Sequence, residues 1–346
     1  MMQQTTAPIT THVSGAASGE VPQPRRGGPN RIIGPSGKPL LVIVEGTDIE
    51  RMIDSGLDAI GGIGQVLAGA REVLLKPNTN QRDPFPSITA PEVLRIVADR
   101  AKSAGARRVI AHEDHKAEPD PYYERNDLPS VELRGSHAPT PDDYILVEHD
   151  GWVGDMEPLA DPPEIPRHSW AAGALGRGYR PTAGPMIRVA REVHQAEVVI
   201  NLPVLKRHFA GQITSALKNH FGSVYGAHRW LAHTMLDRDR DYYDRKLAEF
   251  ASAVRPELTI TDIRSVQTVS GPGRRGDTVI VDGVDQLIVT GDMVAADMVA
   301  MEIMREHDTT FTNAHEAILK RQFAHAEALE LGTSDLSKLE VIRVQT

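Results

Sequence analysis

Residues 72–111, EVLLKPNTNQRDPFPSITAPEVLRIVADRAKSAGARRVIA, decide the fold. The stretch begins and ends with continuous apolar runs, at 72–76 and 108–111, and such runs are typical of strands buried on both faces. Between them, apolar side chains recur at helical spacing over 90–104, and Gly105 follows as a helix stop. A strand, a helix and a second strand in this order predict a parallel sheet covered by helices.

The same alternation continues on both sides of this stretch. Further short apolar runs predict strands at 40–44, 197–202, 258–262, 286–290 and 339–344. Helical spacing predicts helices at 186–196, 236–254, 292–306 and 315–331. Asp292 would cap the third of these helices, whereas Asp297 inside it predicts a buried carboxylate with a partner. We therefore predict an α/β fold of two lobes with largely parallel sheets, covered by helices, and an active-site cleft between the lobes.

The predicted organisation has three parts. Residues 1–38 are rich in Thr, Gly, Pro and Ser, and a segment of that composition cannot bury enough apolar surface to become ordered, so a disordered tail is expected. The first α/β lobe covers 39–185 and includes a loop-rich insertion at about 115–185, which could act as a lid with a short hairpin. The second α/β lobe covers 186–346.

The amino-acid composition excludes several classes of function. The chain has 346 residues and a net charge of −9, so general nucleic-acid binding is not expected. It has no cysteine, which excludes disulfides, thiolate ligands and an iron–sulfur cluster held by its own thiolates. The 14 histidines leave nitrogen and oxygen as donors for any transition metal. No apolar run is long enough to span a membrane, and no apolar core follows the Arg25-Arg26 pair, so a cytoplasmic protein is expected.

The densest polar segment, NLPVLKRHFAGQITSALKNHFGSVYGAHRWLAH at 201–233, starts where a predicted strand ends. In open α/β sheets, ligands bind at the carboxyl ends of the strands. The candidate residues in this segment are Lys206, His208, Lys218 and His233. Together they offer cations for an anion, imidazoles for proton transfer and an amine for covalent chemistry. The alternative interpretation is a surface cluster of cations and hydrogen-bonded histidines.

Three other segments also follow predicted strands. Lys76 and Asn78 end one strand with a cation and an amide, which could hold a carboxylate or phosphate or form a plain polar turn. His112 and Glu113 end the next, where they could bind a divalent ion, transfer protons or lie in a solvated turn. Asp262 ends a later strand and precedes a Gly-rich loop that lacks the spacing of a P-loop or a dinucleotide fingerprint. Each segment is a candidate part of one site.

Several of these segments together resemble the bacterial and archaeal proteins of the domain of unknown function family 362. The segments that carry the resemblance are EVLLKPNTN, SITAPEVLRIVADRAKSAGARRVIAHED, EVVINLPVLKRHFAGQITSALKNHFGSVYG, ELTITDIRSVQTVSGPG and VTGDMVAADMVAMEIM. The resemblance extends over about 40–346. Many members carry ferredoxin-type cysteines, which this chain lacks. The resemblance implies no particular reaction, because the family has no established general activity.

More distantly, the polar segment is similar to nickel-pincer lactate racemases. In those enzymes a Lys tethers a nickel-carrying pyridinium cofactor, a downstream His ligates the nickel, and other His residues move proton or hydride equivalents. By position, Lys218 would match the tether, His233 the nickel ligand and His208 a catalytic imidazole. His112 matches a second catalytic imidazole more loosely, and Asn219, directly after the lysine, departs from the racemase pattern.

We expect an enzyme that acts on a small anionic, carboxylate-bearing substrate, with racemisation or isomerisation as the reaction class. His208 and His112 would be the general acid and base, and Lys218 would be a cofactor tether or an electrostatic stabiliser. His233 would bind a metal or complete the acid–base pair. The residues expected to bind the anion are Lys76, Asn78, Lys206 and Asn219.

Two alternatives stay open at this point. One is a metal-dependent redox or hydrolytic enzyme that uses iron, zinc or manganese. Its ligands would come from His112, Glu113, His233 and Asp262. The other is a non-catalytic anion-binding protein or redox partner. A divalent metal is the expected cofactor if the chain is an enzyme, and neither nucleic acid nor a membrane is an expected partner.

Overall fold

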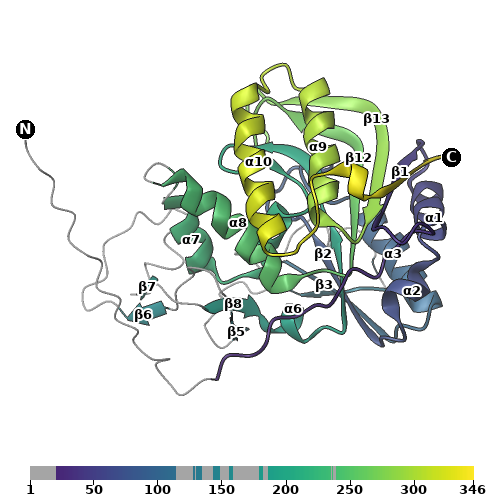
Figure 1. Cartoon of the computed structure of the whole chain (residues 1–346), viewed down its shortest axis with the longest axis horizontal. Coiled ribbons are helices and arrows are strands. Elements are labelled where there is room, and N and C mark those ends of the chain that lie inside the picture. The colour runs from purple at the N-terminus through teal and green to yellow at the C-terminus, as the bar shows by residue number, and fades with distance from the viewer. Residues whose placement is uncertain are drawn as a thin grey trace, which may run out of the picture.

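The computed structural model describes residues 21–113, 128, 130–134, 143–148, 156–158, 179–181, 186–234, 236 and 239–346. Within them, ten strands form one mixed, mostly parallel sheet (Figure 1). Its strands are β1 Leu40–Glu45, β2 Glu72–Pro77, β3 Arg108–His112, β4 Glu132–Arg134, β9 Val198–Leu202, β10 Val204–His208, β11 Gln212–Thr214, β12 Leu258–Thr268, β13 Val279–Thr290 and β14 Glu340–Gln345. Neighbouring strands follow the order β14-β1-β13-β12-β9-β2-β3-β4, and β10 joins β12 to β11.

Helices cover both faces of the sheet, as Figure 1 shows. The helices on one face are α1 Ile49–Ala59, α2 Ile63–Leu67 and α3 Pro91–Ser103. Those on the other are α8 Arg240–Val254, α9 Met293–His307 and α10 Asn313–Ala328. Each group packs its apolar side chains with the sheet in a separate hydrophobic cluster. The central strands β1, β2, β3 and β9 are therefore buried on both faces, which is why they are continuous apolar runs.

Strand β2 shows how one strand serves both faces. Val73 and Leu75 belong to the cluster under α3, whereas Leu74 belongs to the cluster under α8 and α9. Because side chains alternate along a strand, Lys76 follows Leu74 onto the second face. A buried lysine is thereby placed at the carboxyl end of β2.

The α/β fold predicted from the alternation of strands and helices is confirmed. Predicted strands at 40–44, 72–76, 108–111 and 339–344 match β1, β2, β3 and β14. The predicted cap also forms, since the Asp292 carboxylate accepts from the Ala295 backbone N–H at 2.8 Å. The predicted boundaries differ most from the observed ones where a strand continues beyond its apolar residues.

Three elements differ from their predicted extents. β12 continues to Thr268 and β13 begins at Val279, because these strands form a long antiparallel pair beyond their apolar parts. The helix predicted over 186–196 is wrong in its first half. Residues Met186–Ala190 form strand β8, paired antiparallel with β5 (Tyr144–Glu148), and only Arg191–Gln195 form a helix, α6. Ile187, Val189 and Ala190 of β8 are buried in the strand that pairs with β5, and β-branched side chains favour strand over helix.

The predicted lobe boundary at 185/186 does not separate two sheets. β2, from the first predicted lobe, pairs in parallel with β9, from the second, and β1 pairs with both β13 and β14. The two predicted segments therefore share one sheet. Most of the predicted insertion lies outside the described residues; within it, β6 (Met156–Pro158) pairs with β7 (Tyr179–Pro181).

The predicted tail needs a correction over 21–38, while residues 1–20 lie outside the described part of the chain. Arg26 donates to the carbonyls of Val254 and Ala196 at 3.0 and 2.9 Å and pairs with Glu257 at 3.4 Å. Ile32 is buried in the cluster under α1. Long-range hydrogen bonds and one buried apolar side chain therefore order a segment whose composition predicts disorder.

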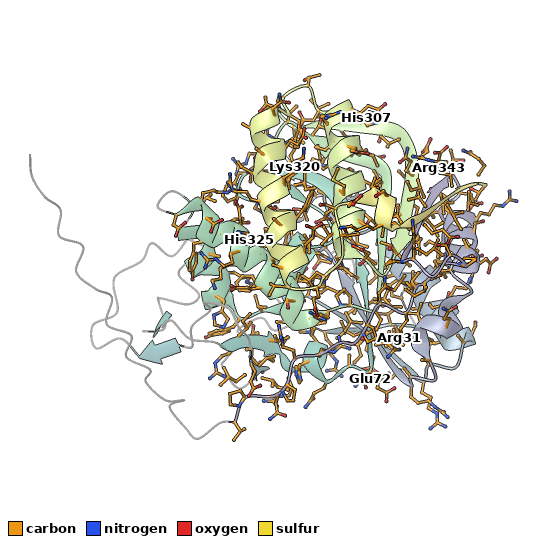
Figure 2. All side chains as sticks on the ribbon, viewed as in Figure 1. Arg31, Glu72, His307, Lys320, His325 and Arg343 are labelled. Atoms are coloured by element: carbon orange, nitrogen blue, oxygen red, sulfur yellow. The ribbon has the colours of Figure 1, made fainter. Side chains whose placement is uncertain are left out.

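In the described residues, no helix is both long and apolar enough to cross a membrane. Charged side chains line the outer helices instead. On α10, Lys320 and His325 are labelled in Figure 2: Lys320 pairs with Glu316 at 2.6 Å and His325 pairs with Asp241 at 2.8 Å.

Candidate functional site

Three buried polar side chains lie next to one another at the carboxyl ends of parallel strands. Lys76 on β2 is the register partner of Asn201 on β9. On the other side, Leu75 pairs with Ala111 of β3, so His112 occupies the next position beside Lys76. The structure therefore places these predicted strand-end residues at one edge of the sheet, on the face covered by α8 and α9.

Lys76 is held by a buried ion pair. Its ammonium lies 2.9 Å from Glu113 Oε2 and donates to the Pro77 carbonyl at 2.7 Å. Glu113 in turn lies against the backbone of Gly222, where an added Cβ would stand 1.6 Å from Glu113 Oε1. The carboxylate predicted as a metal ligand is thus the counter-ion of Lys76, and only glycine leaves it room.

The Lys206 ammonium donates to three oxygens within the protein. Asn78 Oδ1 accepts at 2.9 Å, Asn80 Oδ1 accepts at 3.0 Å, and the Ser87 carbonyl is the third acceptor. An ammonium has three N–H donors, so these contacts satisfy all of them. Lys206 therefore holds the loop that follows β2, through Asn78, Asn80 and Ser87, and adds a positive charge to the site.

Two asparagines predicted to bind substrate bind protein groups. Asn219 Nδ2 donates to the Lys76 carbonyl at 2.9 Å and to Asn201 Oδ1 at 2.8 Å, and its Oδ1 accepts from Asn78 Nδ2 at 2.9 Å. Asn201 Nδ2 donates to the Ala216 carbonyl at 3.0 Å. This buried network joins the strand ends to the short helix η2, Lys218–Ser223, and positions the start of that helix.

Asp297 on α9 holds the turn before η2. Its carboxylate accepts from the backbone N–H of Ala216 at 2.6 Å and of Leu217 at 3.1 Å. Burial raises the pKa of Asp297 to about 6, against the opposing effect of these hydrogen bonds. An aspartate inside an apolar helix predicts a buried, paired carboxylate without naming its partner, and the structure shows that the partner is the backbone next to Lys218.

Lys218, the first residue of η2, is buried. Its ammonium lies 3.6 Å from the centre of the Phe221 ring, a cation–π contact. Among the described residues, no oxygen accepts a hydrogen bond from Lys218 Nζ. Burial first, and then repulsion from Arg229 and Lys206, place the pKa of Lys218 well below its usual value.

Two imidazoles near Lys218 are held in opposite tautomers. His208 Nδ1 accepts from the backbone N–H groups of Ala210 and Gly211 at 3.0 and 3.1 Å, so the neutral ring carries its hydrogen on Nε2. His233 Nδ1 lies 2.7 Å from the Arg229 carbonyl, which only accepts, so that ring carries its hydrogen on Nδ1 and a lone pair on Nε2. The two ring centres are 6.2 Å apart.

Both rings are neutral at pH 7. Burial, followed by repulsion from Lys218, lowers the pKa of His233 to about 3 and that of His208 well below its usual value. Phe209 stacks on His208 at 4.9 Å between ring centres, and 59% of its surface is exposed. The aromatic ring therefore shields the imidazoles on their solvent side.

His112 and Asp262 bind other partners. His112 Nδ1 lies 3.1 Å from Glu192 on α6, and Asp262, in the middle of β12, binds the Arg264 guanidinium at 2.8 Å. Among the residues that the structure describes, no group of three His, Asp or Glu side chains could hold a metal ion. The predicted four-residue metal site is therefore not formed: β12 continues past Asp262, so this carboxylate lies within the strand instead of at its end.

A sequence profile of the family described as Domain of unknown function (DUF362) matches residues 179–302. That range contains β9 to β12, η2 and most of α9, and it therefore includes both Lys218 and Asp297. This chain resembles that family. The match lends no support to the more distant resemblance to nickel-pincer racemases.

Two further matches were found. A thylakoid-associated protein of Synechocystis sp. is 29% identical over 252 residues, which cover 72% of this chain and 68% of that protein. A crystal structure of a protein from Thermotoga maritima matches with a TM-score of 0.37 and 13% identity. That match covers 83% of this chain and 60% of the Thermotoga chain.

Proposed function

We propose that this DUF362-like chain is an enzyme that binds a small carboxylate beside Lys218 and transfers a proton at the carbon next to that carboxylate. The observation that carries the proposal is a buried cluster with more cations than carboxylates, next to two imidazoles of complementary tautomer. Racemisation and isomerisation are the reactions that such a site supports best.

The charge of the cluster favours an anion. Lys218 is repelled by Arg229, Lys206 and Lys76, and Glu113, the carboxylate that acts on it, is already paired with Lys76. A bound carboxylate would offset this repulsion and raise the pKa of Lys218 towards its usual value. Binding of an anion would therefore be accompanied by proton uptake at neutral pH.

The two imidazoles divide the chemistry between them. His208 Nε2–H can donate a hydrogen bond to a substrate oxygen as negative charge develops there, the role of a neutral imidazole as an electrophile. His233 Nε2 can accept the proton from the neighbouring carbon, and a bound anion raises its pKa from about 3 towards the working range. Protonation of the opposite face by solvent water gives racemisation, and return of the proton from His233 to a neighbouring atom gives isomerisation.

The side chains also fit the nickel-pincer cofactor that the more distant resemblance implies. Lys218 has an amine without an oxygen partner in the described residues, and His233 carries a lone pair on Nε2. Lys218 would hold the cofactor through an amide and His233 would ligate its nickel; when bound, the cofactor supplies a hydride acceptor. His208 Nε2 would then be the atom that exchanges a proton with the substrate oxygen.

The proposal is tested by calorimetry with lactate and pyruvate in two buffers of different ionisation enthalpy. We expect carboxylate binding with proton uptake in the wild type and loss of both in Lys218→Met. Lys320→Met, on the surface of α10, is the matched control and should bind like the wild type. Equal binding and equal turnover in Lys218→Met would contradict the assignment of the site. Binding without turnover of any carboxylate would favour the non-catalytic alternative.

A further inference from the structure

Lys218 differs from the other buried lysines in the described part of the chain. Lys76 pairs with Glu113, Lys206 donates to three oxygens, and Lys246 pairs with Glu249. These contacts stabilise the protonated ammonium. Lys218 has an aromatic face 3.6 Å away instead of an oxygen acceptor. Oxygen acceptors thus stabilise three buried lysines as cations, whereas the fourth has only the cation–π contact with Phe221.

The surroundings of Lys218 favour the neutral amine. Removal from water disfavours the charged form, and the nearby cations Arg229 and Lys206 disfavour it further. A desolvated lysine next to another cation is the usual setting of an amine nucleophile. The Lys218 side chain also packs on Gly211, 3.4 Å from a Cβ placed there, and the Gly211 N–H donates to His208. The amine and the imidazole are therefore positioned by the same turn.

We propose that Lys218 is a nucleophile that forms an imine with a small 2-oxo acid, whose carboxylate is held by the neighbouring cations. This inference rests on the anion site of the proposed function and adds a second substrate class to it, because C2 of a 2-oxo acid carries no hydrogen and its removable protons are on C3. The imine explains why the site needs an amine as well as two imidazoles. Once protonated, the imine withdraws electrons from C3 of the acid and so makes a proton on C3 easier to remove.

The step balances without an oxidant or reductant. Lys218 Nζ attacks the carbonyl carbon, an N–C bond forms and the C–O bond breaks. The oxygen leaves as water with the two hydrogens that the amine nitrogen loses. His208 Nε2–H is the donor to the departing oxygen, and His233 Nε2 accepts a proton from the nitrogen.

Reductive trapping tests the proposal. The full chain is incubated at neutral pH with pyruvate or with glyoxylate, reduced with cyanoborohydride, and analysed by intact-mass spectrometry and peptide mapping. We expect one adduct, at Lys218, with about tenfold more label than on exposed lysines such as Lys320 and Lys338. Lys218→Arg keeps a cation and should remove the adduct. Lys246→Arg, which changes a buried lysine paired with Glu249, should keep it.

Two results would overturn the imine. One is label spread over exposed lysines with Lys218 unmodified. The other is a covalent group already present on Lys218 in protein purified from its native host, because that amine could not attack a carbonyl. If pyruvate binds with proton uptake while Lys218 stays unlabelled, the imine fails and the proposed function stands. If pyruvate neither binds nor labels the chain, both fail.

Discussion

The pair formed by Lys76 and Glu113 makes the sharpest stability prediction. Both side chains are buried, with 0% and 7% of their surfaces exposed, and their charged atoms are 2.9 Å apart. Removal of one partner of a buried pair typically costs about 3–5 kcal/mol, because the remaining charge stays out of water. Glu113→Gln keeps the shape and removes the charge, so we expect the free energy of unfolding to fall by about 3 kcal/mol.

Urea unfolding at pH 7 measures this cost, and a double-mutant cycle isolates the pair. Lys76→Met combined with Glu113→Gln removes both charges, and we expect it to be less destabilising than the two single changes added together. Glu316→Gln, which weakens the pairs that Glu316 makes with the exposed cations Lys320 and Arg305, is the control and should cost under about 1 kcal/mol. Simple additivity in the cycle, or a loss below about 1 kcal/mol for Glu113→Gln, would refute a buried, coupled pair.

Three further predictions follow from the supports of the site. Burial raises the pKa of Asp297 from 3.8 to about 6, so its protonated form stabilises the folded state and this stabilisation is lost as pH rises through about 6. In urea unfolding, the free energy of unfolding of the wild type should fall by about 3 kcal/mol relative to that of Asp297→Asn between pH 3 and 7. Parallel pH profiles of the two proteins would disprove this. Gly222→Ala places a Cβ 1.6 Å from Glu113 Oε1 and should lower Tm by several degrees in calorimetry; an unchanged Tm would contradict the packing. Arg26→Ala removes hydrogen bonds to two carbonyls and should speed proteolysis within residues 21–38, whereas an unchanged cleavage rate would argue against an anchored segment.

The strand ends are the part of the site that the sequence predicts well. Apolar runs that stop at Lys76, Asn201 and His112 lie on adjacent parallel strands, and parallel strands bring their carboxyl ends to one edge. The same logic fails at Asp262. The residues after it, Ile263–Thr268, are mostly polar, yet β12 continues through them as one member of a long antiparallel pair. A short apolar run thus locates a strand better than it locates the end of that strand.

The pairing of polar groups inside the site depends on contacts between residues that are far apart in the sequence. Glu113 and Lys76 are 37 residues apart, and Asp297 is 80 residues from the Leu217 N–H that it accepts from. The sequence marks each residue as unusual, a carboxylate after an apolar strand or inside an apolar helix, without naming its partner. The tautomers of His208 and His233 are likewise fixed by backbone groups, which carry no side-chain signal in the sequence.

The central claim is that the Lys218 site moves a proton at the carbon next to a carboxylate. Its most direct test is NMR detection of deuterium incorporated from D2O at C2 of lactate, the carbon next to the carboxylate. We expect incorporation with the wild type and with Lys320→Met. With His208→Gln, the rate of incorporation should fall by at least about a hundredfold. Equal rates with wild type and His208→Gln, or no incorporation above the protein-free background, would contradict the account.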